Sequence, residues 1–426
     1  MSQWVLELND AAIRVTRDGA LVDVSPGVAV VRSDAVLTGA QAAAARWLDP
    51  RATFDRFWQQ PGEQPLPGAT RQVRHHADLL YHHLAAILAR CGRPRQAVLA
   101  VPAHYGDAEL ALVLGITRAL ELDVTALVDM SVAALAGCAA PGSYTVATLY
   151  LHHATLVDVD VDTACTRGAV VTIESVARQR LEHACRDLVA DAFLEQARFD
   201  PLHAAESEQQ LADALPGWLA QAGAAPGEEI ELSLRHAGRA YQARVAAREL
   251  ARISAMVLGA LAERGPPGRD LVLEAELAAL PGARGVLGAT AVLSPDAAAA
   301  GILLHAPLRA PGAATCFLGA LPAAPSPTLA RSATQVATTA APTHLLYGAH
   351  ARAAGGDART LNADGSLGGG DVGHAASVRR ADGRLLLDPG ATTVTLNGRR
   401  LRGEAVLATG DRVRVGGTEF LAIHVD

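Results

Sequence analysis

The order of strand-like and helix-like segments repeats within the first 320 residues, and this repeat limits the folds open to the chain. A twisted hairpin pattern over 4–31 precedes a helical pattern around 77–92, a hydrophobic strand pattern over 96–103 and a helical pattern that begins at Asp107, its expected N-cap. A strand and an Ala-rich helix follow, and the same succession begins again after Tyr144. We therefore expect a duplicated α/β fold of two lobes with a cleft between them.

A break in composition separates this part from the rest of the chain. Residues 321–343, LPAAPSPTLARSATQVATTAAPT, are rich in Pro, Ala, Ser and Thr and have no hydrophobic period, which is typical of a linker. The following segment, 344–426, alternates like a series of strands. The sequence thus predicts an α/β domain over 1–320, a linker over 321–343 and an all-β domain over 344–426.

Composition excludes several classes of function. The 426 residues carry a formal net charge of -7, which argues against a nucleic-acid partner and against an anionic membrane surface. All 37 basic residues are arginines, so neither a P-loop lysine nor a Schiff-base lysine exists here. No apolar run reaches membrane-spanning length, and the five cysteines lack C-x-x-C spacing. We expect a cytoplasmic protein with no membrane insertion and no zinc site.

Histidines are placed in two unusual ways. His152 and His153 fall at the turn of the hairpin TVATLYLHHATLVDVDV, where tight turns favour glycine. A predicted helix carries two further pairs, 75–76 and 82–83, but residues seven apart are separated by about 10 Å, too far to share one ion. We expect solvent-facing or hydrogen-bonded histidines there and predict no metal site.

Several stretches resemble a known superfamily. The segment 96–137, QAVLAVPAHYGDAELALVLGITRALELDVTALVDMSVAALAG, resembles the nucleotide-binding domain of DnaK-type heat-shock chaperones, and RDGALVDVSPGVAVV is similar to the first hairpin of bacterial actins. The stretches IELSLRHAGRAYQARVAARELARISAMVLGAL, DLVLEAELAALPGA and SPDAAAAGILLHA follow in the order of the chaperone lobe that closes over adenosine. This resemblance implies a two-lobed actin-like ATPase fold of duplicated ribonuclease-H-like halves over 1–320.

The resemblance also implies how ATP and magnesium would bind. In that superfamily two hairpin turns hold the phosphates with backbone amides, an Asp near each turn organises magnesium and water, and a diglycine lies beside adenosine. Glycine lets phosphate approach the backbone, and carboxylate oxygens suit a hard cation. The first turn, Asp-Leu-Gly-Thr-Thr in the family, falls on residues 7–11 and keeps an acid at Glu7. It loses the glycine at Asn9 and places Asp10 where a phosphate would lie.

The remaining nucleotide contacts are also altered. The second turn, Asp-Leu-Gly-Gly-Gly-Thr in the family, falls on residues 150–155, so the histidines stand where phosphate-binding glycines would be. The diglycine corresponds to Ala275 and Glu276, which place side chains in the purine space. The altered cleft expected from the resemblance comprises Glu7, Asn9, Asp10, Asp129, Ser131, Tyr150, His152, His153, Thr155, Ala275 and Glu276.

The tail resembles a forkhead-associated domain. The segment GHAASVRRADGRLLLDPGATTVTLNGRRLRGEAVLATGDRVRVGGTEFLAIHV shows that family's His-Ala strand, Asn-Gly turn and Gly-Asp turn, which implies a β-sandwich that binds phosphothreonine. The family's arginine and serine positions fall on Gly369 and Asp371, and Asp371 would repel phosphate. The other residues of this altered phosphopeptide face are His374, Thr392, Thr393 and Asn397.

These observations predict a non-catalytic scaffold or adaptor, a pseudo-ATPase that binds protein partners through both domains, with no cofactor and no catalytic residue. Two alternatives stay open. One is a divergent ATP-dependent chaperone-like or actin-like ATPase with magnesium. The other is a phosphopeptide-binding protein that acts through the tail. Oligomerisation also stays open.

Overall fold

The chain divides into two compact units, Met1–Ser332 and Ala333–Asp426. The first unit is mixed α/β, and the strands of the second pair antiparallel throughout its described part. The computed structural model describes residues 2–265, 268–308, 315–329, 342–347, 350–354, 359–362, 366–368, 376–381, 384–396, 399–401, 403–407 and 411–423. In these ranges no helix is both long enough and apolar enough to cross a membrane.

The first sheet combines an antiparallel meander with parallel strands. The first three strands pair antiparallel with one another, and three parallel strands continue the sheet beside the first of them. In sheet order the strands are β16 (Phe317–Leu318), β8 (Asp123–Asp129), β7 (Gln96–Val101), β1 (Trp4–Glu7), β2 (Ile13–Arg17) and β3 (Ala20–Ser25).

The second sheet repeats this plan. Its strands in order are β15 (Ala291–Val292), β14 (Asp270–Leu273), β9 (Gly142–Leu149), β10 (Ala154–Val161), β11 (Ala164–Ile173) and β17 (Ala320–Pro322). Strands β9, β10 and β11 form the meander, while β14 and β15 run parallel to β9. Both sheets therefore contain a three-stranded meander with parallel strands beside its first strand, although the second sheet has one parallel strand fewer and adds antiparallel β17. Strand β17 pairs with β11, so the first unit extends past residue 321, where we expected the linker to begin.

Helices of the first half pack around the first sheet. These elements are α1 (Ala40–Ala43), η1 (Pro50–Ala52), α2 (His76–Arg90), α3 (Asp107–Ala119) and α4 (Met130–Ala136), with a small sheet of β4 (Ala29–Val31), β5 (Val36–Thr38) and β6 (Thr53–Phe54). The expected N-cap of α3 is wrong by one residue. Gly106 is the N-cap, its amide donates to the Glu109 carboxylate at 2.9 Å, and Asp107 begins the helix.

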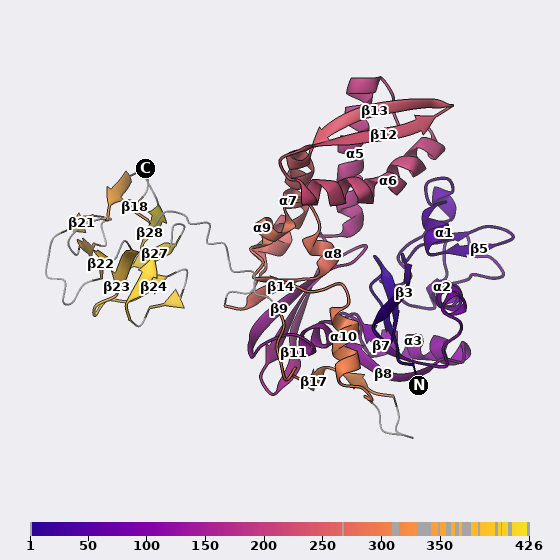
Figure 1. Ribbon diagram of the computed structural model, residues 1–426, viewed down its shortest axis with the longest axis horizontal. Helices are drawn as coiled ribbons and strands as arrows, with labels where there is room; N and C mark the ends of the chain where they lie inside the picture. The colour runs from indigo at the N-terminus through magenta and orange to yellow at the C-terminus, as the bar shows by residue number, and fades with distance from the viewer. Residues whose placement is uncertain are drawn as a thin grey trace. The chain divides into compact units, whose positions relative to one another are not determined.

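The second half carries an added layer. Figure 1 shows α5 (Arg178–Ala197), α6 (Ala205–Ala224) and α7 (Ala247–Glu263) next to a two-stranded ribbon of β12 (Glu229–His236) and β13 (Arg239–Ala246). These elements share a core that includes Phe193, Leu211, Leu232 and Leu250. The short helices α8 (Ala275–Ala278), α9 (Ala283–Leu287) and α10 (Ala297–Leu304) complete this half.

A shared core joins the two halves. Val5 of β1 and Val146 of β9 belong to one buried cluster with side chains of α4 and α10. The two helices approach so closely that a Cβ added at Gly301 would lie 1.8 Å from the carbonyl oxygen of Ala133. The halves are therefore fused at this joint, and a rotation about it would displace them least there.

The second unit has two antiparallel sheets that share one core. The first sheet contains β19 (His350–Ala353), β18 (His344–Tyr347), β28 (Thr418–Ile423), β27 (Arg412–Val415), β24 (Val394–Leu396) and β25 (Arg399–Arg400). The other contains β21 (Leu367–Gly368), β20 (Arg359–Leu361), β22 (Ser377–Ala381), β23 (Arg384–Asp388) and β26 (Ala405–Leu407). Leu345 and Phe420 from the first sheet pack in the same cluster as Val378 and Leu387 from the second.

Candidate functional site

The hairpin turn between β9 and β10 carries the two adjacent histidines, as the sequence predicts. The amide of Tyr150 donates to the carbonyl of His153 at 2.8 Å and closes the turn. His152 is 6% exposed, and its Nε2 lies 3.1 Å from the Asp55 carboxylate. Burial acts to raise the pKa of Asp55, but His152, together with the charges of Arg46 and Arg56, outweighs it and holds that pKa below its usual value. His152 thus links the second half to the segment before α2.

His153 faces a second histidine rather than solvent. Its Nε2 lies 3.2 Å from Nδ1 of His104, and its ring stacks on Tyr150 with centroids 4.6 Å apart. Burial, with the neighbouring His104, lowers the pKa of His153 to about 3, and burial lowers the pKa of His104 to about 4. Both rings are therefore neutral at pH 7 and add no positive charge to the cleft.

The first hairpin turn, between β1 and β2, meets the second turn directly. Asp10 is 3% exposed, and one of its carboxylate oxygens accepts the amide of Leu151 at 2.7 Å. Burial raises the pKa of Asp10 to about 6. Asn9 accepts the amide of Ala11 with its side-chain oxygen and donates from Nδ2 to the carbonyl of Leu149 at 3.3 Å. Two side chains of the first turn thus bind backbone groups of the second half.

A cluster of acids lies beside these turns. Asn9 also donates to Glu274, the N-cap of α8, at 3.3 Å. Burial raises the pKa of Glu274 to about 8, with further contributions from Glu276 and Glu7. Burial also raises the pKa of Glu7 to about 7. Glu276 itself pairs with Arg178 of α5 at 2.6 Å. Three acids therefore gather in this corner of the cleft, and two of them, Glu274 and Glu276, are bonded to other side chains of the protein.

The remaining cleft residues predicted from the sequence lie at the starts of α4, β10 and α8. Asp129 caps α4, because one of its oxygens accepts the amides of Ser131 and Val132 at 2.9 and 3.1 Å. The other oxygen lies 3.3 Å from Arg167. Thr155 is fully buried at the start of β10. Ala275 begins α8, so the position expected to lie beside the purine is helical.

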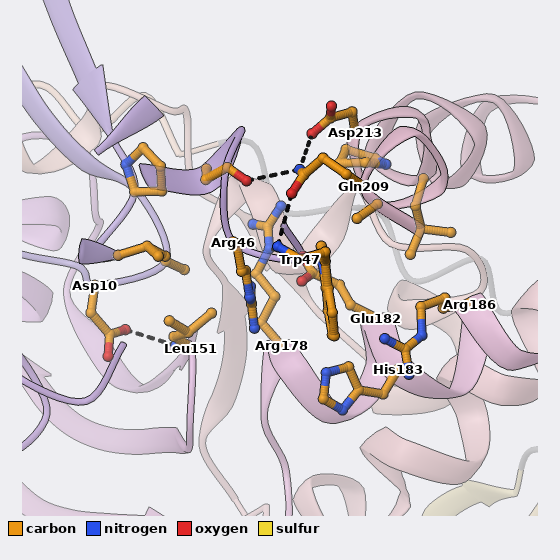
Figure 2. A pocket seen from close by; sticks show the side chains of 17 residues that line it. Asp10, Arg46, Trp47, Leu151, Arg178, Glu182, His183, Arg186, Gln209 and Asp213 are labelled. Carbon is orange, nitrogen blue, oxygen red and sulfur yellow. Dashed lines mark hydrogen bonds and ion pairs between the residues drawn. The ribbon is translucent and has the colours of Figure 1, made fainter. Parts of the chain in front are cut away.

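Two small cavities lie between the halves. One, of about 30 Å³, lies next to Glu7, Ser131 and Glu274. A second cavity, of about 200 Å³, lies nearer the mouth, and Figure 2 shows Asp10 and Leu151 on one side of it with Gln209 across it. A larger hollow of about 610 Å³ lies elsewhere, beside β1, β7 and the end of α10, and its lining has no titratable side chain.

The histidines of α2 form hydrogen bonds with different protein groups and share no partner. His83 is fully buried, lies 2.8 Å from Oγ of Ser25 and accepts from Trp58 Nε1 at 2.9 Å. His82 contacts a different partner, the carbonyl of Gln72. Across the described ranges, no group of three or more His, Cys, Asp and Glu side chains is arranged to hold a metal ion.

The phosphopeptide face expected in the tail is described only in part. Thr392 and Thr393 lie just before β24, where the amide of Thr392 donates to the carbonyl of Pro389 at 3.1 Å. The other positions of that face lie outside the described residues: Gly369, Asp371, His374 and Asn397.

Sequence reasoning missed several residues that shape the cleft. His104 follows the quoted Val-Pro-Ala strand, and Glu274 directly precedes the diglycine position, so both were visible in motifs already singled out. Asp55, Trp47 and Gln209 had no such signal, because they belong to segments that match no motif.

Comparison with models of known protein families gave no match. Comparison with curated proteins gave none either.

Proposed function

We propose that this protein is a non-catalytic scaffold or adaptor of the cytoplasm, a pseudo-ATPase of the actin and heat-shock chaperone superfamily. The matching strand order of the two sheets supports the resemblance, since duplicated halves around a cleft characterise that superfamily. The shared core of the two sheets in the second unit likewise supports the forkhead-associated resemblance. Both folds serve here as surfaces for protein partners.

The observation that carries this proposal is the bond between Asp10 and Leu151. In the superfamily, backbone amides of both hairpin turns bind the phosphates of ATP. Here a carboxylate of the first turn accepts an amide of the second at 2.7 Å. A phosphate entering this position would have to displace the carboxylate and would meet its negative charge at short range. Such repulsion in a buried site costs on the order of several kcal/mol.

The space and charge of the cleft support the same proposal. The two cavities, of about 30 and 200 Å³, are each smaller than the roughly 300–1,000 Å³ of typical ligand pockets. On the purine side, Glu276 is held by Arg178, and Glu274 lies beside it. His104 and His153 are neutral and the chain has no lysine. The three arginines that line the 200 Å³ cavity, Arg46, Arg178 and Arg186, each form an ion pair with a carboxylate of the protein.

A steady-state hydrolysis assay tests the proposal. With ATP and magnesium, the full chain should release phosphate no faster than buffer, and Glu7→Gln and Asp129→Asn should behave as the wild type does. Magnesium-dependent release that disappears in Glu7→Gln would show instead that the chain is a divergent ATPase. Phosphothreonine peptides serve as a second probe, and specific binding to 344–426 would make the tail a phosphopeptide reader.

A further inference from the structure

A short strap of the first half crosses onto the second half at the mouth of the cleft. We define the strap as residues 43–47, which begin at the last residue of α1. The amide of Trp47 donates to Oε1 of Gln209 on α6, and Nε2 of Gln209 donates to the carbonyl of Ala43, both at 2.9 Å. One glutamine side chain thus binds two backbone groups of the opposite half, as Figure 2 shows for Gln209 and Trp47.

The Trp47 side chain adds contacts across the same junction. The guanidinium of Arg186, on α5, lies 4.5 Å from the Trp47 ring centroid, and His183 packs against the ring at 5.8 Å in an edge-on arrangement. Arg186 is held in place by Glu208 at 2.8 Å. A cation over a tryptophan face contributes about 0.5–1 kcal/mol when exposed and more when desolvated. The strap is therefore fastened by its side chain as well as its backbone.

The contacts beneath the strap belong to the same interface. Leu151 of the second hairpin turn packs in a small apolar cluster with Val28 and Val30 of the first half and with Ala42 and Ala45. Leu151 is also the residue whose amide binds the Asp10 carboxylate. Loss of the strap contact would therefore remove the outer cover from the bond that joins the two turns.

The position of the strap, away from the joint between the halves, lets it resist their separation. The two halves are fused through α4 and α10, whose backbones are in close contact. Figure 1 shows α1 and α6 in the upper part of the first unit and α10 in its lower part. A hinge at the fused end would separate the halves most at the strap. A contact there resists opening more effectively than one near the joint.

We propose that the strap is a latch that keeps the two halves closed without any ligand. This inference rests on the proposed function, because in an ATPase the bound nucleotide would bridge the halves. Here Gln209 and Trp47 do so from within the chain. When the latch is released, the halves separate and the 200 Å³ cavity behind it opens. Binding of a partner to the strap would therefore release the latch and open the cleft of the first unit.

Hydrogen exchange of the full chain tests the latch. Gln209→Ala removes both cross-half hydrogen bonds, whereas Gln221→Ala changes an exposed glutamine on the same helix and serves as the control. We expect Gln209→Ala to raise exchange roughly tenfold in 43–47 and also in 149–153, where the Leu151 amide is bonded to Asp10. Gln221→Ala should leave both segments unchanged.

The pattern of exchange decides the proposal. Faster exchange confined to 43–47, with 149–153 as slow as in the wild type, would show a local contact and overturn the latch. Unchanged exchange in both segments would overturn it too. ATP binding, measured separately on the wild type, would count against the proposed function, and the exchange pattern would still decide whether the strap is a latch.

Discussion

The two hairpin turns at the centre of the cleft hold equivalent places in the two halves, yet they meet each other with different chemistry. The turn after β1 reaches across with side chains, the Asp10 carboxylate and the Asn9 amide. The turn after β9 offers backbone groups of Leu149 and Leu151. The comparison shows that side chains of the first turn bind backbone groups of the second, so these hydrogen bonds join the two halves across the cleft.

The largest expected contrast between the turns is in their response to acid. His153 has its pKa lowered from 6.5 to about 3, so its contribution to stability is complete above pH 6.5 and is lost as the pH falls toward 3. Between pH 6.5 and 4, the unfolding free energy of the wild type should fall more steeply than that of His153→Gln. The difference should approach about 1.4 kcal/mol per pH unit, measured by urea titration at each pH.

Asp10 of the first turn should show the opposite sign. Its pKa is raised from 3.8 to about 6, so its contribution is complete below pH 3.8 and is lost as the pH rises through 6. Replacing His153 therefore removes the part of the unfolding free energy that falls as the pH is lowered, and replacing Asp10 removes the part that falls as the pH is raised. Identical slopes for wild type and His153→Gln would show that this ring is not buried in its neutral form.

The next largest effect should come from cutting the bond between the turns. Asp10→Ala leaves the buried Leu151 amide without an acceptor, so the unfolding free energy at pH 4, where burial of charge does not offset this bond, should fall by about 1–3 kcal/mol. Asp10→Asn keeps an acceptor of the same shape and should cost less than Asp10→Ala. Chemical denaturation measures both variants. Equal costs for Ala and Asn would mean that the hydrogen bond is not what the carboxylate contributes.

A smaller effect should follow from loss of His152, the outer histidine of the second turn. His152→Ala removes a partner of the partly buried Asp55 but leaves Arg46 at 3.3 Å from that carboxylate. We expect a loss of about 1 kcal/mol in unfolding free energy and a higher pKa for Asp55, which carbon-13 NMR of the carboxylate can follow. An unchanged Asp55 pKa would show that His152 does not interact with the Asp55 carboxylate across the cleft.

The smallest effect should come from a polar contact outside the cleft. Arg244 on the solvent side of the β12–β13 ribbon pairs with Glu231 at 3.2 Å, and both side chains are exposed. Arg244→Ala should change the unfolding free energy by less than about 0.5 kcal/mol. This variant is the reference for the cleft variants. If Arg244→Ala lowered the unfolding free energy as much as they do, buried and exposed polar contacts would not differ in their contribution to stability.

Local pattern predicted the elements of the two turns but not their pairing. The alternation around His152 and His153 predicted a hairpin with both residues at its turn, because strand periodicity is written in neighbouring residues. The bond from Asp10 to Leu151 joins residues 141 positions apart, and only the folded sheets bring them together. The sequence marked Asp10 as an obstacle to phosphate. It could not show which group that carboxylate binds.

The same limit applies to helix starts and to the mouth of the cleft. The first turn of α3 was recognised, yet Gly106 rather than Asp107 caps it, because the Glu109 side chain binds the Gly106 amide. Gln209 carried no signal at all, since a glutamine in an Ala-rich helix is ordinarily solvent-facing. Its role depends on the strap that folding places opposite it.

Titration calorimetry with ATP and magnesium on the full chain tests the central claim most directly, because it measures binding whether or not hydrolysis follows. The account predicts no heat of binding at nucleotide concentrations up to about 1 mM, where a bound complex would be worth only about 4 kcal/mol. A magnesium-dependent isotherm in the micromolar range would contradict it, since the Asp10 carboxylate and the nucleotide's phosphate cannot both hold the Leu151 amide.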